Sequence, residues 1–155
     1  MTIHIMTTLC YLKRDGQTLM LHRTKKNHDI HEGKWNGLGG KFLPGESPEE
    51  CVVREVEEES GFRINNPKLH GFLTFPNFKE GQDWQMFLYT ADQFSGQMKA
   101  CDEGDLAWII DSKLKELPLW EGDYLFLDWI KQNKFFTGKF IYQNKKLISH
   151  SVCFY

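Results

Sequence analysis

The sequence predicts an α+β fold in which two helices pack on a mixed β-sheet. Three observations predict it: short segments of strand character recur along the chain, only two segments have the signals of a helix, and no repeat or linker interrupts the 155 residues. Because a chain of this length can bury about two-thirds of its unfolded surface, we expect a single domain over residues 1–155.

The amino-terminal part reads as two strands joined by a tight turn. Ile3–Leu12 is rich in Thr, Ile and Leu, the turn signal Arg14-Asp15-Gly16 follows it, and Thr18–His22 resumes as a short apolar segment. Residues 24–45 are first polar and then rich in glycine. We therefore expect this stretch to be loop with at most a brief strand.

A helix with strong end signals comes next. Ser47 is placed to cap it, Pro48 suits its first position, and Glu50, three residues after Ser47, completes a capping box. Gly61 suits a left-handed residue just beyond its carboxyl end.

The remaining segments alternate between strand and helix signals. Leu69–Phe75 and Trp84–Ala91 predict strands joined by a loop that contains Pro76 and Gly81, and Ala107–Ile110 predicts a short buried strand. The apolar spacing within Tyr124–Ile130 predicts an amphipathic helix. A closing hairpin is expected from two segments that flank Gln143-Asn144, namely Phe135–Tyr142 and Lys146–Tyr155.

Composition argues against several functional classes. Nineteen basic and 21 acidic residues give a net charge of -2, which offers no general attraction to a nucleic acid polymer or an anionic membrane. The longest purely apolar run, Leu106–Ile110, is far shorter than the about 20 residues of a membrane span, and no basic segment precedes the apolar start as in a signal peptide. We expect a cytoplasmic protein that is a monomer or possibly a dimer.

The cysteines and histidines suggest no metal site. The four cysteines are widely spaced without a C-x-x-C pair, and we interpret them as ordinary thiols. His28 and His31 are close in sequence but lie in a polar stretch, where we expect them on the surface.

The helix after Ser47 carries a dense group of carboxylates. At about 100° per residue, Glu55, Glu58 and Glu59 share one face beside an apolar face of valines. On composition alone such a helix is usually just solvated, but like charges this close are unfavourable without cations. Arg54 supplies one positive charge, and oxygen-only ligands suit Mg²⁺, or possibly Mn²⁺, for the rest.

Spacing then distinguishes this helix from an ordinary acidic one. Gly40, Glu46, Arg54-Glu55-Val56, Glu58-Glu59 and Gly61-Phe62 form the pattern G-x5-E-x7-R-E-U-x-E-E-x-G-U. This pattern over residues 40–62 resembles the signature of the Nudix hydrolase family. It departs only at Phe62, where the family usually has an aliphatic residue.

The resemblance implies a fold, a chemistry and residue roles. The fold would be an α/β/α sandwich, and the activity hydrolysis of a nucleoside diphosphate linked to another group. Glu55, Glu58, Glu59 and the Gly39 carbonyl match metal-ligand positions, with Glu103 as an acidic ligand outside the signature, and Glu46 with Arg54 matches a pair that braces the helix. Glu55 or Glu58, with Glu103 as a third candidate, would be the general base.

Further segments resemble the MutT branch, in particular its animal-type oxidised purine nucleoside triphosphatases. These segments are residues 35–41, residues 120–123 and residues 138–140. The resemblance implies that Thr8 and Arg23 lie near the sugar and phosphates, Asn36 and Asp123 at the base, and Trp120 against its ring. Lys41 could contact phosphate.

One departure concerns the base-reading residues. The subgroup commonly has two adjacent aspartates where this chain has Gly122-Asp123, so one group that would read the purine edge is missing. The expected activity is conversion of 8-oxo-dGTP to 8-oxo-dGMP and diphosphate, which would remove damaged nucleotides before they enter DNA. Alternatives are a Nudix enzyme for ADP-ribose, a dinucleoside polyphosphate or capped RNA, and a non-catalytic nucleotide sensor.

Overall fold

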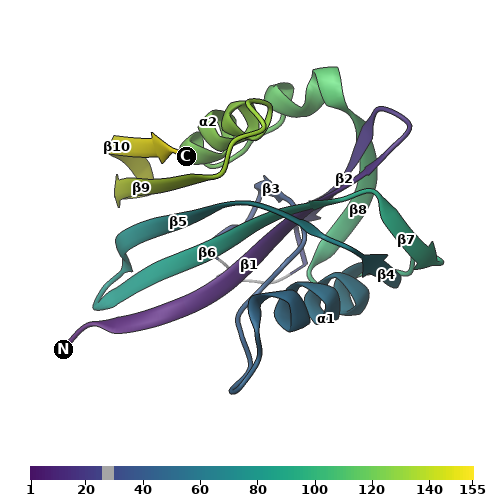
Figure 1. Ribbon diagram of the computed structural model, residues 1–155, viewed down its shortest axis with the longest axis horizontal. Coiled ribbons are helices and arrows are strands. Elements are labelled where there is room, and N and C mark those ends of the chain that lie inside the picture. Colours follow the sequence, from purple (N-terminus) through teal and green to yellow (C-terminus); the bar gives the residue numbers. More distant parts are fainter. Residues whose placement is uncertain (26–29) are drawn as a thin grey trace.

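The protein is a mixed β-sheet with helices on both faces, as the computed structural model shows (Figure 1). The structure describes residues 1–25 and 30–155. The strands are β1 Ile3–Arg14, β2 Gln17–Arg23, β3 Trp35–Asn36, β4 Phe62–Asn65, β5 Lys68–Lys79, β6 Gln82–Ala91, β7 Gln93–Gly96, β8 Gly104–Ile110, β9 Phe136–Gln143 and β10 Lys146–Phe154. The helices are α1 Pro48–Ser60, the 3-10 helix η1 Asp111–Glu116 and α2 Glu121–Ile130. The α+β class and the α/β/α layering predicted from the sequence are confirmed.

The large sheet has the strand order β10-β9-β5-β6-β1-β2-β3, with β8 also paired to β2. The pairs β1–β6 and β5–β9 are parallel, and the other pairs of this sheet are antiparallel. A separate two-stranded sheet joins β4 to β7. The long central strand β1 therefore has a partner on each side and carries residues to both layers.

Alternation along β1 divides the core between the two helices. Cys10 and Leu12 point to the layer that contains Val52 and Val56 of α1, whereas Tyr11 points to the layer that contains Phe126 of α2. Successive side chains of a strand face opposite sides of the sheet, which explains this division. Both helices are thus fixed against the same central strand.

The ends of α1 are formed as the sequence predicts. The Ser47 hydroxyl accepts from the Glu50 amide at 3.1 Å, and the Glu50 carboxylate accepts from the Ser47 amide at 3.0 Å. Gly61 has a φ of +84°, and its amide donates to the Glu57 carbonyl at 2.8 Å. Phe62, the departure from the family signature, is 4% exposed and packs in the core beside Phe94.

Two predicted segments differ from the structure. The expected loop at Pro76 is a bulge within β5, because Phe75 pairs with Trp84 and Lys79 with Gln82, leaving three residues opposite one. The segment Ala107–Ile110 lies within the longer strand β8 and is only half-buried, with Ile110 55% exposed. Strand β8 pairs only with β2 in this sheet, so its other edge is unpaired among the described strands.

The two-residue strand β3 agrees with the brief strand allowed within residues 24–45. The short elements β4, β7 and η1 were not predicted. They contain four, four and six residues, too few for a periodic pattern, and the two strands depend on partners distant in sequence. His28 lies outside the described residues. No helix in the described part of the chain is long and apolar enough to cross a membrane.

We predict that Ser47→Ala lowers the free energy of unfolding by about 1 kcal/mol, because the Glu50 amide loses its acceptor at the start of α1. Urea denaturation measures this change. Ser149→Ala, at an exposed position of β10, is the control and should differ from the wild-type protein by less than about 0.5 kcal/mol. Equal stability of the two variants would show that the cap contributes nothing.

Candidate active site

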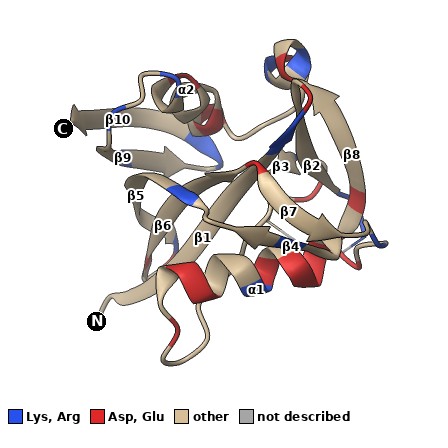
Figure 2. Cartoon of the chain, turned by 45° about the vertical axis from the view of Figure 1, so that its right-hand side comes forward, with Lys and Arg blue, Asp and Glu red and all other residues tan. Residues whose placement is uncertain are grey.

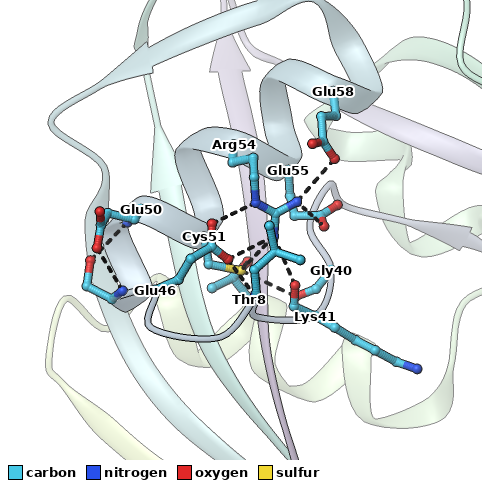
Figure 3. Close-up of polar contacts among 11 residues, drawn as sticks. Thr8, Gly40, Lys41, Glu46, Glu50, Cys51, Arg54, Glu55 and Glu58 are labelled. Atoms are coloured by element: carbon cyan, nitrogen blue, oxygen red, sulfur yellow. Dashed lines mark hydrogen bonds and ion pairs between the residues drawn. The ribbon is translucent and has the colours of Figure 1, made fainter.

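Arg54 lies at the centre of a group of carboxylates on and beside α1 (Figure 3). Its guanidinium donates to both oxygens of Glu46, at 2.7 and 2.9 Å, and to the Lys41 carbonyl at 3.0 Å. The remaining nitrogen donates to Glu55 at 2.8 Å and to Glu58 at 3.1 Å. One cation therefore ties the loop before the helix to two of the predicted metal ligands.

The glycine loop packs closely against this helix. The Gly39 amide donates to a Glu59 oxygen at 2.8 Å, and the Gly40 carbonyl accepts from the Thr8 amide of β1 at 2.9 Å. A Cβ on Gly40 would lie 2.6 Å from the Glu55 carboxylate, and one on Gly39, whose φ is +154°, would lie 2.0 Å from the Thr8 carbonyl oxygen. Only glycine lets the loop lie between β1 and the acidic residues.

Acidic residues gather along α1 (Figure 2), but they are not equivalent. The side chain of Glu58 is 60% exposed and that of Glu55 is 17% exposed, whereas Glu59 is buried. Their common helical face, predicted from the sequence, therefore runs from solvent into the interior.

Burial and mutual repulsion raise the pKa of two of these carboxyls. Burial raises the pKa of Glu59 well above its usual range, with a hydrogen bond to Glu103 acting in the same direction. Burial also raises the pKa of Glu55, although Arg54 opposes this change. By contrast, the hydrogen bond from Arg54 lowers the pKa of Glu46. Arg54 therefore supplies one positive charge to a group that contains more than one carboxyl.

The chemistry of this donor set fits a hard divalent cation. The side chains are carboxylates, the usual protein ligands of Mg²⁺ and Mn²⁺, and a cation would relieve the repulsion between Glu59 and Glu103. Across residues 1–25 and 30–155, no three carboxylate, imidazole or thiol side chains already stand in position to hold a metal ion.

A cavity of about 450 Å³ is lined by Glu55 of α1, by Glu103, and by residues of the sheet and of α2. Nine of the residues predicted from the sequence line it: Thr8, Arg23, Asn36, Gly39, Lys41, Glu55, Glu103, Trp120 and Asp123. The other four, Glu46, Arg54, Glu58 and Glu59, do not line it and lie on or just before α1. The structure brings the predicted substrate-binding residues together around one space.

At the acidic end of the cavity, cationic groups accompany the carboxylates. An Arg23 nitrogen lies 3.6 Å from a Glu103 oxygen, so Arg23 partly balances this acid. Lys41 has its ammonium 5.2 Å from the centre of the Trp84 ring, a cation–π contact at the wall of the cavity. The Thr8 hydroxyl lies 3.4 Å from the Cys51 sulfur.

The opposite end of the cavity is aromatic and contains two buried polar side chains. The Asn36 amide nitrogen is buried and has no hydrogen-bond partner among the described residues. Asp123 is 7% exposed, and burial raises its pKa to about 8, while Lys34 acts in the opposite direction. Its carboxyl is therefore largely protonated at neutral pH and able to donate a hydrogen bond as well as accept one.

Sequence reasoning missed several residues of this cavity. Phe78, Trp84 and Tyr142 form aromatic walls, and Phe78 reaches the cavity from the bulge after Pro76. The expectation that His31 lies on the surface was wrong, because its ring lines the cavity and contacts Trp120. These residues carry no motif, and they reach the cavity through a turn, a bulge and strands that are distant in sequence.

Comparison with known proteins shows the family of this chain. The NUDIX domain model matches residues 4–130. The chain belongs to the Nudix family. The uncharacterized Nudix hydrolase YvcI of Bacillus subtilis is 35% identical over 141 residues, covering 87% of this chain and 85% of that protein.

Two further relatives indicate the branch of the family. The oxidized purine nucleoside triphosphate hydrolase of Danio rerio is 30% identical over 141 residues, covering 91% of this chain and 88% of that protein. The crystal structure of the MutT protein from Bacillus halodurans superposes with a TM-score of 0.83 at 30% identity, covering 96% and 97% of the two chains. This Nudix hydrolase thus resembles the MutT branch and its animal-type members.

We predict that Arg54→Lys lowers kcat for nucleotide hydrolysis by at least about tenfold with little change in KM. A lysine cannot hold Glu46 with two bonds while also contacting Glu55 and Glu58. Steady-state kinetics measure the effect. Arg63→Lys, whose native side chain is 63% exposed, is the matched control and should keep wild-type kinetics. Equal kinetics for both variants would contradict the role assigned to Arg54.

Proposed function

We propose that this Nudix hydrolase removes oxidised purine deoxynucleoside triphosphates, converting 8-oxo-dGTP to 8-oxo-dGMP and diphosphate. The observation that carries the proposal is the cavity itself, which is lined both by Glu55 of α1 and by Asn36, whose buried amide nitrogen has no hydrogen-bond partner among the described residues. A nucleoside triphosphate has the matching order of groups, with phosphates at one end and a flat polar base at the other.

The aromatic end of the cavity suits an oxidised purine. The Asn36 amide can both donate to and accept from a base edge, and a protonated Asp123 carboxyl can do the same. The 8-oxo form of guanine carries an N–H donor at N7 where guanine has an acceptor. Stacking on Trp120 would contribute roughly 1 to 3 kcal/mol.

The acidic end suits hydrolysis of a diphosphate bond. Glu55, Glu58, Glu59, Glu103 and the Gly39 carbonyl would hold Mg²⁺ or Mn²⁺. When bound, the metal would neutralise charge on the phosphate oxygens and activate water. Glu55 or Glu58, with Glu103 as a third candidate, would accept the proton of the attacking water.

Other residues of this chain would hold the substrate in place. Arg54 orients Glu55 and Glu58 through direct hydrogen bonds, and Glu46 fixes Arg54 in turn. Arg23 and Lys41, both on the cavity wall, would contact phosphates, with Thr8 near the sugar. We further propose that the protein acts in the cytoplasm as a monomer, possibly a dimer, without binding nucleic acid polymers or membranes.

A kinetic panel with Mg²⁺ tests the substrate. We predict that 8-oxo-dGTP is hydrolysed with a kcat/KM at least about tenfold above that of dGTP. ADP-ribose, a dinucleoside polyphosphate and capped RNA should be poorer substrates. Preferred turnover of one of these three would move the function to another Nudix class, and tight binding without any turnover would indicate a nucleotide sensor.

In the same assay, Glu58→Gln should lower kcat/KM for 8-oxo-dGTP at least about a hundredfold, or about 2.7 kcal/mol of transition-state stabilisation. Glu57→Gln is the matched control, since the neighbouring Glu57 side chain is also exposed and contacts only Arg63 among the described residues. A similar activity of both variants would remove Glu58 from the catalytic group.

The protonated state of Asp123 predicts a pH dependence. Because burial raises the pKa of this carboxyl to about 8, it is protonated below that pH and loses its proton above it. We predict that kcat/KM for 8-oxo-dGTP falls at pH values above about 8 in the wild-type enzyme. Asp123→Asn, which resembles the neutral carboxyl, should lose this alkaline limb.

The titratable neighbours of Asp123 are not expected to produce this alkaline limb. Among the described residues, the titratable groups that interact with Asp123 are Lys34, Tyr11 and Tyr142. Burial raises the pKa of both tyrosines above the pH range of this assay. Asp128→Asn, on the exposed side of α2, should keep the wild-type pH profile. An alkaline limb that persists in Asp123→Asn would assign it to another group.

A further inference from the structure

The turn at residues 30–34, just before β3, makes a specific contact with Trp120. The indole N–H donates to Nδ1 of His31 at 2.8 Å, and the two rings meet edge to face with centroids 5.5 Å apart. The Lys34 ammonium, from the same turn, lies 5.3 Å from the centre of the Trp120 ring. Two residues of one turn therefore contact the residue proposed to stack on the base.

This turn is itself anchored to the sheet. The His31 carbonyl accepts from the Lys34 amide at 3.0 Å, and the Gly33 amide donates to the Arg23 carbonyl at 2.7 Å. The Arg23 amide donates back to the Lys34 carbonyl at 2.9 Å. Because Arg23 ends β2, the position of His31 is set by the strand that also carries a cavity residue.

Trp120 lines two cavities of the protein. Besides the main cavity, it lines a second one of about 180 Å³, and Phe78, Tyr142 and Ile30 also border both. The centroids of Phe78 and Tyr142 lie 5.1 and 5.3 Å from that of Trp120. These ring contacts pack against the indole but supply no acceptor for its N–H.

The hydrogen bond to His31 favours one orientation of the Trp120 ring. Trp120 is 5% exposed, so most of its indole is removed from bulk water. Indole nitrogen can only donate, and a buried donor without an acceptor is unfavourable. Among the described residues, Nδ1 of His31 is the acceptor of this N–H, which makes any ring orientation that breaks the bond costly.

We propose that His31 is a positioning residue, which holds the Trp120 ring at the angle needed to receive a nucleotide base. This inference rests on the proposed function only in that a base enters the main cavity. It assigns a role in affinity to a histidine outside the family signature, which touches no predicted metal ligand in the contacts described here.

Two substitutions separate the hydrogen bond from simple packing. His31→Asn keeps an acceptor one bond beyond Cγ, where Nδ1 lies, but loses the ring. His31→Phe keeps a ring that can pack on Phe78, whose centroid is 6.3 Å from that of His31, but loses the acceptor. A packing role would favour phenylalanine, whereas the proposal favours asparagine.

We expect His31→Phe to raise KM about fivefold with kcat nearly unchanged, and His31→Asn to stay within about twofold of the wild-type enzyme. The substrate is whichever nucleotide of the kinetic panel has the highest kcat/KM. In a Trp120→Phe background, which lacks the N–H, the two His31 variants should have equal KM values. Glu32→Gln, at the exposed neighbouring position, is the control and should behave as wild type.

A second readout needs no substrate. In the ¹⁵N NMR spectrum of the free protein, the indole N–H of Trp120 is the signal missing from Trp120→Phe. We expect it to stay protected from exchange with water in His31→Asn and to lose protection in His31→Phe. Unchanged protection in His31→Phe, or a higher KM in His31→Asn than in His31→Phe, would overturn the proposal. Failure of 8-oxo-dGTP as a substrate would instead leave this NMR result standing and overturn only the proposed function.

Discussion

The concentration of negative charge around Arg54 is the constraint on which the rest of the site depends. One guanidinium contacts Glu46, Glu55 and Glu58, while Glu59 is buried against the Gly39 amide. Burial raises the pKa of Glu55 and of Glu59, so the folded protein disfavours the charged form of both carboxyls. A bound divalent cation would offset the repulsion between these carboxyls, and phosphate oxygens would then become favourable neighbours.

The fold supplies what this charge requires. Capping and Gly61 fix where α1 begins and ends, and β1 holds the glycine loop at the distance that the carboxylates need. The other residues of the cavity include Asp123 in the first turn of α2 and Asn36 on β3. The two ends differ in chemistry because one is bordered by acidic side chains and the other by aromatic ones. A molecule with phosphates at one end and a base at the other matches both.

The sequence could predict the parts of this arrangement that are local. The cap at Ser47, the break at Gly61 and the clustering of Glu55, Glu58 and Glu59 follow from short-range spacing. Only the family resemblance predicted that Glu103 joins this acidic group. Its position beside Glu59 depends on where β8 pairs in the sheet. His31, Phe78 and Tyr142 carried no signal, since a bulge, a turn and a distant strand bring them to Trp120. The different exposure of Glu58 and Glu59 likewise depends on what packs over the helix.

The most direct test of the central claim is a crystal structure of the protein with Mn²⁺ and a non-hydrolysable nucleoside triphosphate analogue. Anomalous scattering would locate the metal independently of the nucleotide. The account predicts Mn²⁺ bound by carboxylates from among Glu55, Glu58, Glu59 and Glu103, with phosphate oxygens of the analogue completing its coordination. An analogue bound in the cavity with these carboxylates free of metal, or Mn²⁺ bound only elsewhere on the protein, would contradict it.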